Sequence, residues 1–236
     1  MRRRFPLDQI LFLDIETVPQ AAAYKDLDGT SQQLWEQKTQ GQRKEEISAE
    51  DFYERAGLMA EFGKIVCISV GFFNFDGGRT IRVTTFHGEE RELLKEFRAL
   101  LDGHYARAGQ FLCAHNGKGF DFPYIARRMV IHGLELPDKL DLFGKKPWEV
   151  PHLDTMELWK FGDFKHYVSL KLLAHVLGIP SPKEDMDGSM VREVFHGQGD
   201  IDRIVEYCEL DVVTTAQVLL RLQGDGLLSE GEIKKV

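Results

Sequence analysis

The sequence is short of positive charge. Among its 236 residues, 30 are Lys or Arg and 38 are Asp or Glu, which gives a formal net charge of −8. Proteins that grip long nucleic-acid duplexes usually show the opposite balance, because neutralising phosphates supplies much of their affinity. This composition argues against an extended electrostatic contact with duplex DNA. A nucleic-acid enzyme with this charge would contact few nucleotides and take its local positive charge from bound metal.

Cysteines and long apolar runs are also scarce. Cys67, Cys113 and Cys208 are widely spaced in apolar surroundings, so neither a zinc-binding pair nor a disulfide framework can be built from them. The longest apolar run, residues 65–75, is interrupted by Ser, Gly and Asn and is too short to span a membrane. The basic residues 2–4 are not followed by the apolar segment of a signal peptide. We therefore expect a cytoplasmic protein without membrane contact.

What the sequence does contain is a pattern typical of an α/β fold. The continuous apolar run of residues 10–15 predicts a central strand buried on both faces. Two β-rich runs, 64–75 and 79–86, are separated by Asp-Gly-Gly and predict a hairpin. Further elements are expected as short strands at 111–114 and 152–154, and as helices at 89–101, 123–132, 169–177 and 200–222.

This order predicts one domain over residues 1–236. We expect a mixed five-stranded sheet, with its first three strands antiparallel, flanked by helices. Residues 20–60 differ from the rest because they are polar and carry apolar residues at loose helical spacing. That segment is expected to be an insertion of two helices.

Two acids on the first predicted strand are the first candidate site residues. Asp14 and Glu16 are two positions apart, so their side chains leave the same face of the strand. Carboxylates this close repel each other unless a proton or a cation lies between them, and burying them is costly without such compensation. Solvated acids at a strand end are the alternative.

Four further polar positions have both a structural and a functional interpretation. Asp121 precedes Pro123 by two residues and could be a helix N-cap. Tyr207 and Asp211 are four apart on the last predicted helix, so they lie one above the other, either as core and boundary residues or as part of a site. Asp154, followed by Thr155, is assigned to helix capping rather than to metal binding.

Taken together, these segments resemble the three motifs of the DEDD exonucleases, the DnaQ-like superfamily with an RNase H-like fold. The first is FLDIET at residues 12–17, the second is NGKGFDFPY at 116–124 and the third is YCELD at 207–211. Position 206 is Glu rather than His, which fits the tyrosine subclass. The motifs are most similar to the proofreading exonuclease domain of B-family DNA polymerases, here in a free-standing form.

The resemblance implies a two-metal site. Asp14, Glu16, Asp121 and Asp211 would hold two divalent ions, and their oxygen ligands favour Mg²⁺ or Mn²⁺. Tyr207 would orient the attacking water rather than act as a base, because its unperturbed pKa is near 10. Substrate contacts are implied for five other residues, Ile15, Thr17, Asn116, Phe120 and Lys183, with a solvated loop lysine as the alternative for Lys183.

The expected activity is removal of nucleotides from the 3′ end of single-stranded DNA. The same chemistry on RNA is the first alternative, since tyrosine-type members are also similar to ribonuclease D. A non-catalytic nucleic-acid-binding module is the second alternative, and the presence of all four acids with the tyrosine counts against it. The sequence does not indicate a protein partner.

Overall fold

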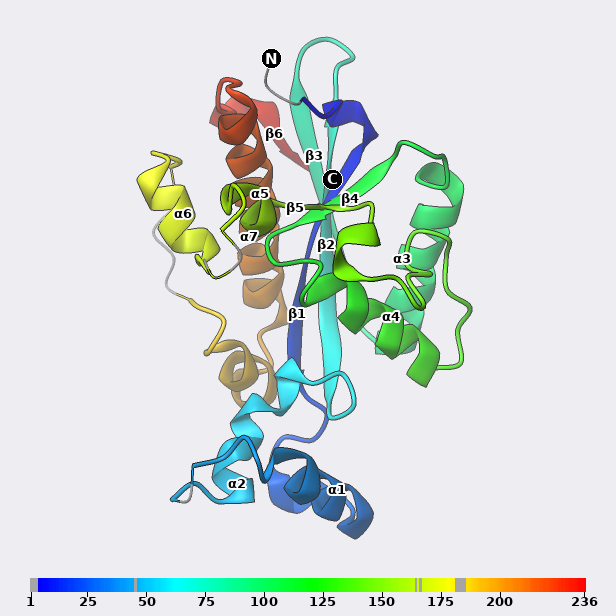
Figure 1. The fold of residues 1–236 in the computed structure, drawn as a ribbon, viewed down its shortest axis with the longest axis vertical. Helices are drawn as coiled ribbons and strands as arrows, with labels where there is room; N and C mark the ends of the chain where they lie inside the picture. Colours follow the sequence, from blue (N-terminus) through cyan, green and yellow to red (C-terminus); the bar gives the residue numbers. More distant parts are fainter. Residues whose placement is uncertain (1–3, 45, 164, 166, 181–185) are drawn as a thin grey trace.

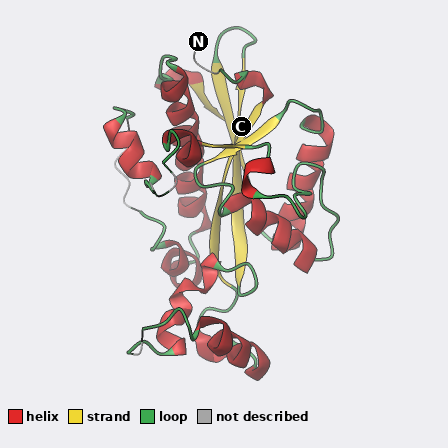
Figure 2. Ribbon diagram, viewed as in Figure 1, coloured by secondary structure: helices red, strands yellow, loops and turns green. Residues whose placement is uncertain are grey.

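A six-stranded mixed sheet forms the centre of the molecule (Figures 1 and 2). The computed structural model describes residues 4–44, 46–163, 165, 167–180 and 186–236. The strand order is β5-β4-β1-β2-β3-β6, with β1 at Ile10–Pro19, β2 at Gly63–Asn74, β3 at Thr80–His87, β4 at Phe111–Ala114, β5 at Leu153–Asp154 and β6 at Ile233–Lys235. The first three strands are antiparallel neighbours, whereas β4, β5 and β6 each pair in parallel. The expected α/β fold is confirmed, with one strand more than predicted.

Helices cover both faces of this sheet (Figure 1). On one face lie α3 (Glu90–His104) and α4 (Asp121–Ile131), which share a core with Leu11, Leu13 and Ile15 of β1. On the other face lies the long α7 (Ile201–Gln223), which packs on Ile10 and Phe12. The apolar run of β1 is therefore buried from both sides, as its composition predicts.

A close approach between α7 and the sheet depends on Gly71 of β2. A Cβ atom at this position would lie 2.7 Å from Cγ1 of Val212 on α7, which is closer than carbon atoms can pack. The absence of a side chain at Gly71 thus allows α7 to pack directly against β2. The smaller helices α5 (Thr155–Trp159) and α6 (Leu170–Val176) lie beside α7.

The segment between β1 and β2 forms the two helices expected there, α1 (Gly29–Thr39) and α2 (Ala49–Phe52), followed by a 3₁₀ helix, η3 (Tyr53–Leu58). Its own small core contains Trp35, Phe52 and Tyr53. The indole of Trp35 donates a hydrogen bond of 2.8 Å to the Ala49 carbonyl, which satisfies the polar atom of a fully buried ring.

The three cysteines are buried and free, as predicted. In the described part of the chain, no helix combines the length and the apolar character that crossing a membrane requires.

Candidate active site

Asp14 and Glu16 lie where β1 loses one of its neighbours. The parallel partner β4 pairs with Ile10–Phe12, whereas the antiparallel pairing with β2 continues to Pro19. Beyond Phe12, one side of β1 therefore lies past the end of β4, and chain segments from elsewhere can approach it. Asp14 is half-buried and Glu16 is 9% exposed.

Asp121 approaches this edge from the loop that follows β4. It is the first residue of α4, and its side chain is 3% exposed. Phe120 takes the N-cap position of α4, which has no side-chain capping bond, so the interpretation of Asp121 as an N-cap is wrong. A buried carboxylate that does not cap the helix needs other hydrogen-bond donors or a cation to offset the free-energy cost of its burial.

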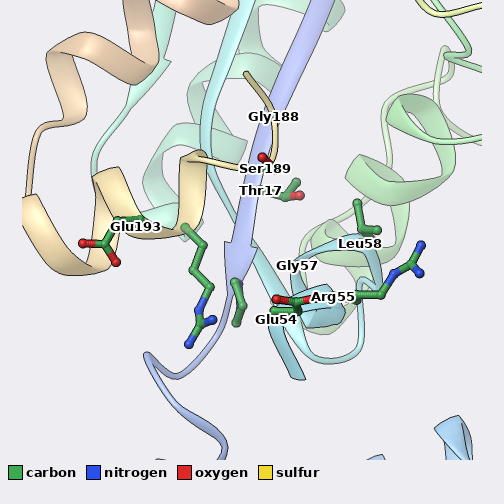
Figure 3. A pocket seen from close by; sticks show the side chains of 10 residues that line it. Thr17, Glu54, Arg55, Gly57, Leu58, Gly188, Ser189 and Glu193 are labelled. Carbon is green, nitrogen blue, oxygen red and sulfur yellow. The ribbon is translucent and has the colours of Figure 1, made fainter. Parts of the chain in front are cut away.

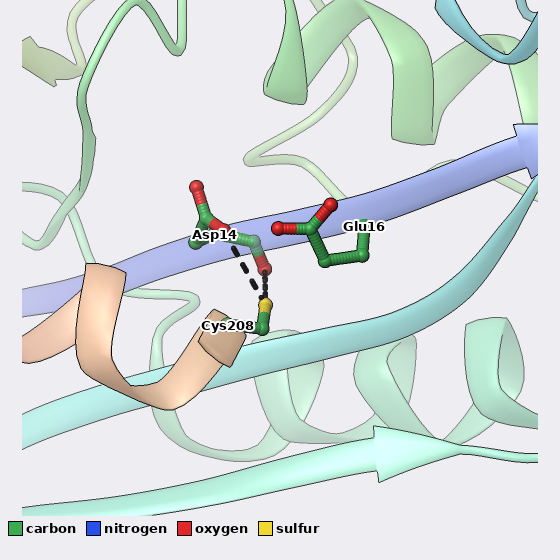
Figure 4. Close-up of side chains that lie close together, drawn as sticks. All are labelled: Asp14, Glu16 and Cys208. Carbon is green, nitrogen blue, oxygen red and sulfur yellow. Dashed lines mark hydrogen bonds between the residues drawn. The ribbon is translucent and has the colours of Figure 1, made fainter. Parts of the chain in front are cut away.

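From the opposite face, α7 contributes a thiol to the two acids of β1. The Cys208 sulfur donates hydrogen bonds to the backbone carbonyl and to Oδ2 of Asp14, each at 3.4 Å (Figure 4). The Cys208 sulfur and one carboxylate oxygen each from Asp14 and Glu16 lie within 4.8 Å of one another. These three side chains surround a point that a metal ion could occupy.

Tyr207 and Asp211 flank Cys208 on the same helix. Both side chains are half-buried. The negative charge of Asp211 contributes to the raised pKa of Asp14, Glu16 and Asp121, so the four predicted acids interact with one another. The structure thus brings together the acids of all three sequence motifs.

Burial and neighbouring negative charges raise the pKa of Asp14, Glu16 and Asp121. Burial is the main cause that raises the pKa of Asp14, followed by the charges of Asp121, Asp211 and Glu16. Burial also raises the pKa of Glu16, with Cys67 and then Asp211 and Asp121 adding to the shift. Burial raises the pKa of Asp121 to about 7, although backbone hydrogen bonds oppose it. In the described part of the chain, no Lys or Arg forms an ion pair with these three acids.

A further acid, Asp154, holds the loop between β4 and α4 in place. Its Oδ1 accepts hydrogen bonds from the backbone N–H groups of Met156 and Glu157, which confirms its predicted role as the cap of α5. The same carboxylate accepts from the N–H groups of Asn116, at 3.0 Å, and Lys118, at 3.1 Å. Four backbone donors satisfy Asp154, so it needs no cation.

The backbone geometry of this loop explains why residue 117 is a glycine. Asn116 has φ 64°, and the chain turns sharply there. At Gly117, a Cβ atom would lie 2.5 Å from the Cβ of Ala114 and 2.8 Å from the Phe122 ring. The turn that delivers Asp121 to the edge of β1 therefore requires glycine at 117.

The predicted substrate contacts lie in different surroundings. Ile15 is 5% exposed in the core, and Phe120 packs on Tyr124 with ring centroids 5.2 Å apart. Asn116 lies in the loop held by Asp154, and Thr17 lines a cavity at the end of β1 (Figure 3). Lys183 falls outside the described residues.

Two histidines near the site have structural roles. His115 bonds to Thr155 and to the Val168 carbonyl, both at 2.9 Å. His152 accepts from the Leu112 N–H at 3.3 Å and contacts the Lys139 carbonyl. Burial lowers the pKa of both imidazoles, so the neutral form is favoured.

Sequence reasoning missed the place of Cys208. In the sequence, Cys208 is only one of three widely spaced cysteines in apolar surroundings. The signal was its position directly after Tyr207, on the turn of the helix that faces β1. Its contact with Asp14 depends on the close approach of α7 to the sheet, which a sequence does not display.

An α/β sheet of this topology is typical of RNase H-like proteins, and the four interacting acids beside its central strand form a candidate divalent-metal site. A family model for predicted 3′-5′ exonucleases related to the exonuclease domain of PolB matches residues 57–235, more than half of the chain. The protein belongs to this family. The match includes Asp121, Tyr207 and Asp211, whereas Asp14 and Glu16 precede it and join the site through the fold. No curated protein matches the chain.

Proposed function

We propose that the protein is a metal-dependent 3′→5′ exonuclease that removes nucleotides from the end of single-stranded DNA. The observation that carries this proposal is the set of buried and half-buried acids, Asp14, Glu16 and Asp121, whose pKa values are raised by burial and by neighbouring carboxylates and with which no described Lys or Arg forms an ion pair. Membership of a family of predicted 3′-5′ exonucleases supports the same conclusion.

The donor set fits hard divalent cations. Asp14, Glu16, Asp121 and Asp211 offer carboxylate oxygens, the ligands that Mg²⁺ and Mn²⁺ prefer. When bound, two such ions would activate the attacking water and neutralise charge on the leaving 3′ oxygen. Asp14 would help to hold both ions, Glu16 and Asp211 would help to hold the ion that activates the water, and Asp121 would help to hold the ion that neutralises the leaving oxygen.

The remaining groups of the site position the reacting atoms. Tyr207, one turn before Asp211 on α7, would donate or accept a hydrogen bond to hold the attacking water. Cys208 fixes the Asp14 carboxylate through its bond to Oδ2. Asp154 fixes the loop that carries Asn116, and this loop leads directly into Asp121. Each of these contacts reduces the freedom of the site before substrate binds.

The direct test uses 5′-labelled single-stranded DNA and RNA of one sequence, incubated with Mg²⁺, Mn²⁺ or EDTA. We expect stepwise shortening of the DNA from its 3′ end with either metal and none in EDTA. Faster shortening of the RNA would mean that RNA is the preferred substrate and that the same hydrolysis acts on it.

A closed circular single strand is the control for end dependence. Because the site must admit an unpaired terminal nucleotide, the circle should stay intact while the linear strand is degraded. Equal cleavage of both would contradict the exonuclease proposal. Binding of DNA without hydrolysis under every metal condition would leave a non-catalytic binding module instead.

A further inference from the structure

Exposed aromatic side chains gather in one part of this chain. Among the described residues, five aromatic side chains leave more than half of their surface exposed, and four of them lie between positions 143 and 167. These four are Phe143, Trp148, Phe161 and Tyr167, which are 96%, 76%, 82% and 70% exposed. Rings of this size are usually buried, and a group of exposed apolar side chains indicates an interaction surface.

Three of these rings lie on the chain around α5, the short helix that follows the edge strand β5 (Figure 1). Trp148 precedes β5 and lines a cavity of about 380 Å³ together with Leu158 of α5. Phe161 comes three residues after Leu158. Such a short piece of chain keeps their Cα atoms within roughly 11 Å of each other. The chain before β5 and the chain after α5 therefore lie close together, although the two are separate loops.

Phe161 is exposed in a backbone conformation that is costly for it. Phe161 has φ 45°, and Gly162 follows with φ 95°. The Asp163 N–H donates a hydrogen bond of 2.8 Å to the Lys160 carbonyl and closes a turn with these two residues at its centre. Glycine and asparagine are the usual residues at such positions, and a bulky ring is strained there. The Trp159 ring lies edge-on to Phe161, with centroids 6.1 Å apart, so the exposed ring belongs to a defined turn.

The charge of this part of the chain differs from that of the whole. Between positions 143 and 167 the sequence has four lysines and four acids, so this stretch is neutral in a chain of net charge −8. In the described part of the chain, none of the four lysines forms an ion pair; they are Lys145, Lys146, Lys160 and Lys165. The ammonium group of Lys146 lies 5.4 Å from the centroid of the Trp148 ring.

The four acids of the same stretch already have partners in the protein. Asp154 is buried and accepts from backbone N–H groups, as described above. Glu157 forms an ion pair with Lys118 at 2.9 Å. Glu149 and Asp163 each accept a hydrogen bond from a backbone N–H group, at 2.8 and 3.1 Å. The lysine ammonium groups are therefore available for an anionic ligand such as a phosphate.

The third ring, Tyr167, lies near the candidate active site. It directly precedes Val168, whose carbonyl oxygen bonds to Nε2 of His115 at 2.9 Å. His115 is followed by Asn116, in the loop that leads to Asp121. A strand that lies over Trp148, Phe161 and Tyr167 would thus come close to the acids of the site at its Tyr167 end.

We propose that Trp148, Phe161 and Tyr167 form an aromatic surface that binds the single-stranded part of the substrate on the 5′ side of the nucleotides being removed. The inference rests on the proposed function and adds a binding surface outside the metal site. The rings stack on bases without reading their identity, because every base has a π face, and the lysines contact phosphates. Stacking suits an acidic protein, because this part of the affinity does not depend on net positive charge.

Binding in EDTA tests the aromatic surface without hydrolysis. Fluorescence anisotropy of a labelled oligothymidylate of about 12 nucleotides measures the affinity. Trp148→Ala and Phe161→Ala should each weaken binding at least about fivefold, because each removes one stacking partner. Trp148→Phe keeps a ring and should retain most of the affinity. Phe75→Ala removes a ring of 51% exposure directly after β2, far from α5 along the chain, and should bind as the wild type does.

Strand length and salt separate stacking from a general effect of charge. The loss of affinity in Phe161→Ala should be smaller for a trinucleotide, because it covers fewer rings. Lys145→Gln together with Lys146→Gln should lower the salt dependence of binding, whereas Trp148→Ala should leave it unchanged. Lys38→Gln together with Lys44→Gln, in the insertion between β1 and β2, is the control and should keep the wild-type salt dependence.

Wild-type affinity for the long strand in both Trp148→Ala and Phe161→Ala would overturn the inference. If the wild type nevertheless shortened DNA from its 3′ end, the proposed function would stand and the strand would bind elsewhere. If the two variants lost affinity but the wild type shortened neither DNA nor RNA with metal, the aromatic surface would stand and the proposed function would fail.

Discussion

Acids at two places in this molecule differ in what offsets the cost of burying their charge. Glu90 of α3, 8% exposed, forms a two-pronged ion pair with Arg128 of α4 at 2.8 and 2.6 Å, and it also accepts from the Ile65 N–H at 2.7 Å. Although burial opposes it, these donors lower the pKa of Glu90. At the end of β1, burial and neighbouring carboxylates raise the pKa of Asp14, Glu16 and Asp121.

The difference separates a structural acid from the acids of the proposed metal site. Glu90 has its cation built into the protein, so ionisation stabilises the fold. Asp14 has a thiol donor and Asp121 has backbone donors, but among the described residues neither they nor Glu16 forms an ion pair with a Lys or Arg. Ionisation of these acids therefore costs free energy until a cation binds. Burial alone does not identify an active site, whereas buried acids without a protein cation indicate one.

Removing an acid from the cluster should have the largest effect on activity. We expect Asp14→Ala to lower the rate of 3′-end hydrolysis at least about a thousandfold, equivalent to roughly 4 kcal/mol of activation free energy, because Asp14 would contact both ions. Initial rates on a labelled oligonucleotide measure this. Asp138→Ala, at an exposed acid, is the control and should keep wild-type rates. Near-normal activity of pure, folded Asp14→Ala would place the metal site elsewhere.

Removing the Arg128 guanidinium that pairs with Glu90 should instead lower the stability of the fold. Arg128→Met leaves Glu90 buried without its main partner, so the free energy of unfolding should fall by about 3–5 kcal/mol. Urea denaturation, followed by circular dichroism, measures the loss. Glu90→Gln with Arg128→Met should recover part of it, because the double variant buries no unpaired carboxylate. Equal stability of Arg128→Met and the wild type would show that the pair is dispensable.

The pH dependence of stability should distinguish the two groups further. A carboxyl whose pKa is raised in the folded state binds more protons folded than unfolded, so its contribution to stability is lost as the pH rises. For Asp121, the loss falls between its ordinary pKa of 3.8 and about 7 in the folded protein. The opposite sign holds for Glu90, whose contribution is lost as the pH falls below about 4.5.

Melting temperatures in EDTA across about pH 4 to 8 test this sign, because this range covers almost the whole interval between the two pKa values of Asp121. The wild type should lose more stability than Asp121→Asn as the pH rises through this window. With saturating Mn²⁺, the difference between the two proteins should reverse near pH 7. Parallel curves for the two proteins in EDTA would mean that the pKa of the Asp121 carboxyl is the same in the folded and the unfolded protein.

The smallest effect should come from the thiol beside Asp14. Cys208→Ala removes the hydrogen bonds from Cys208 to Asp14, which we expect to cost about 1 kcal/mol of stability and to weaken Mn²⁺ binding severalfold. Cys208→Ser keeps a donor at this position and should restore metal affinity more than stability. Identical Mn²⁺ affinity in the two variants would reduce Cys208 to a packing residue.

The acids of the candidate site were predictable from the sequence. Strand periodicity places Asp14 and Glu16 on one face, and the order of the three motifs along the chain points to Asp121 and Asp211. Local patterns also gave the hairpin of β2 and β3 and the long α7. Strand β6 was missed because its residues Ile-Lys-Lys carry no strand pattern, and the edge of β3 alone makes them a strand. The cavity at Thr17 was missed because three segments far apart in sequence form it.

The most direct test of the central claim compares wild type and Asp14→Asn with and without Mn²⁺. At 100 times its Kd, a ligand that binds only the folded state adds about 2.7 kcal/mol of stability. For a chain of this size, that raises the Tm by about 5–10 °C. We predict this rise for the wild type and a smaller one for Asp14→Asn. In EDTA, Asp14→Asn should melt at or above the wild type, because one negative charge has left the cluster. An Asp14→Asn protein that melts well below the wild type in EDTA would contradict the account, because Asp14 would then be a structural acid like Glu90.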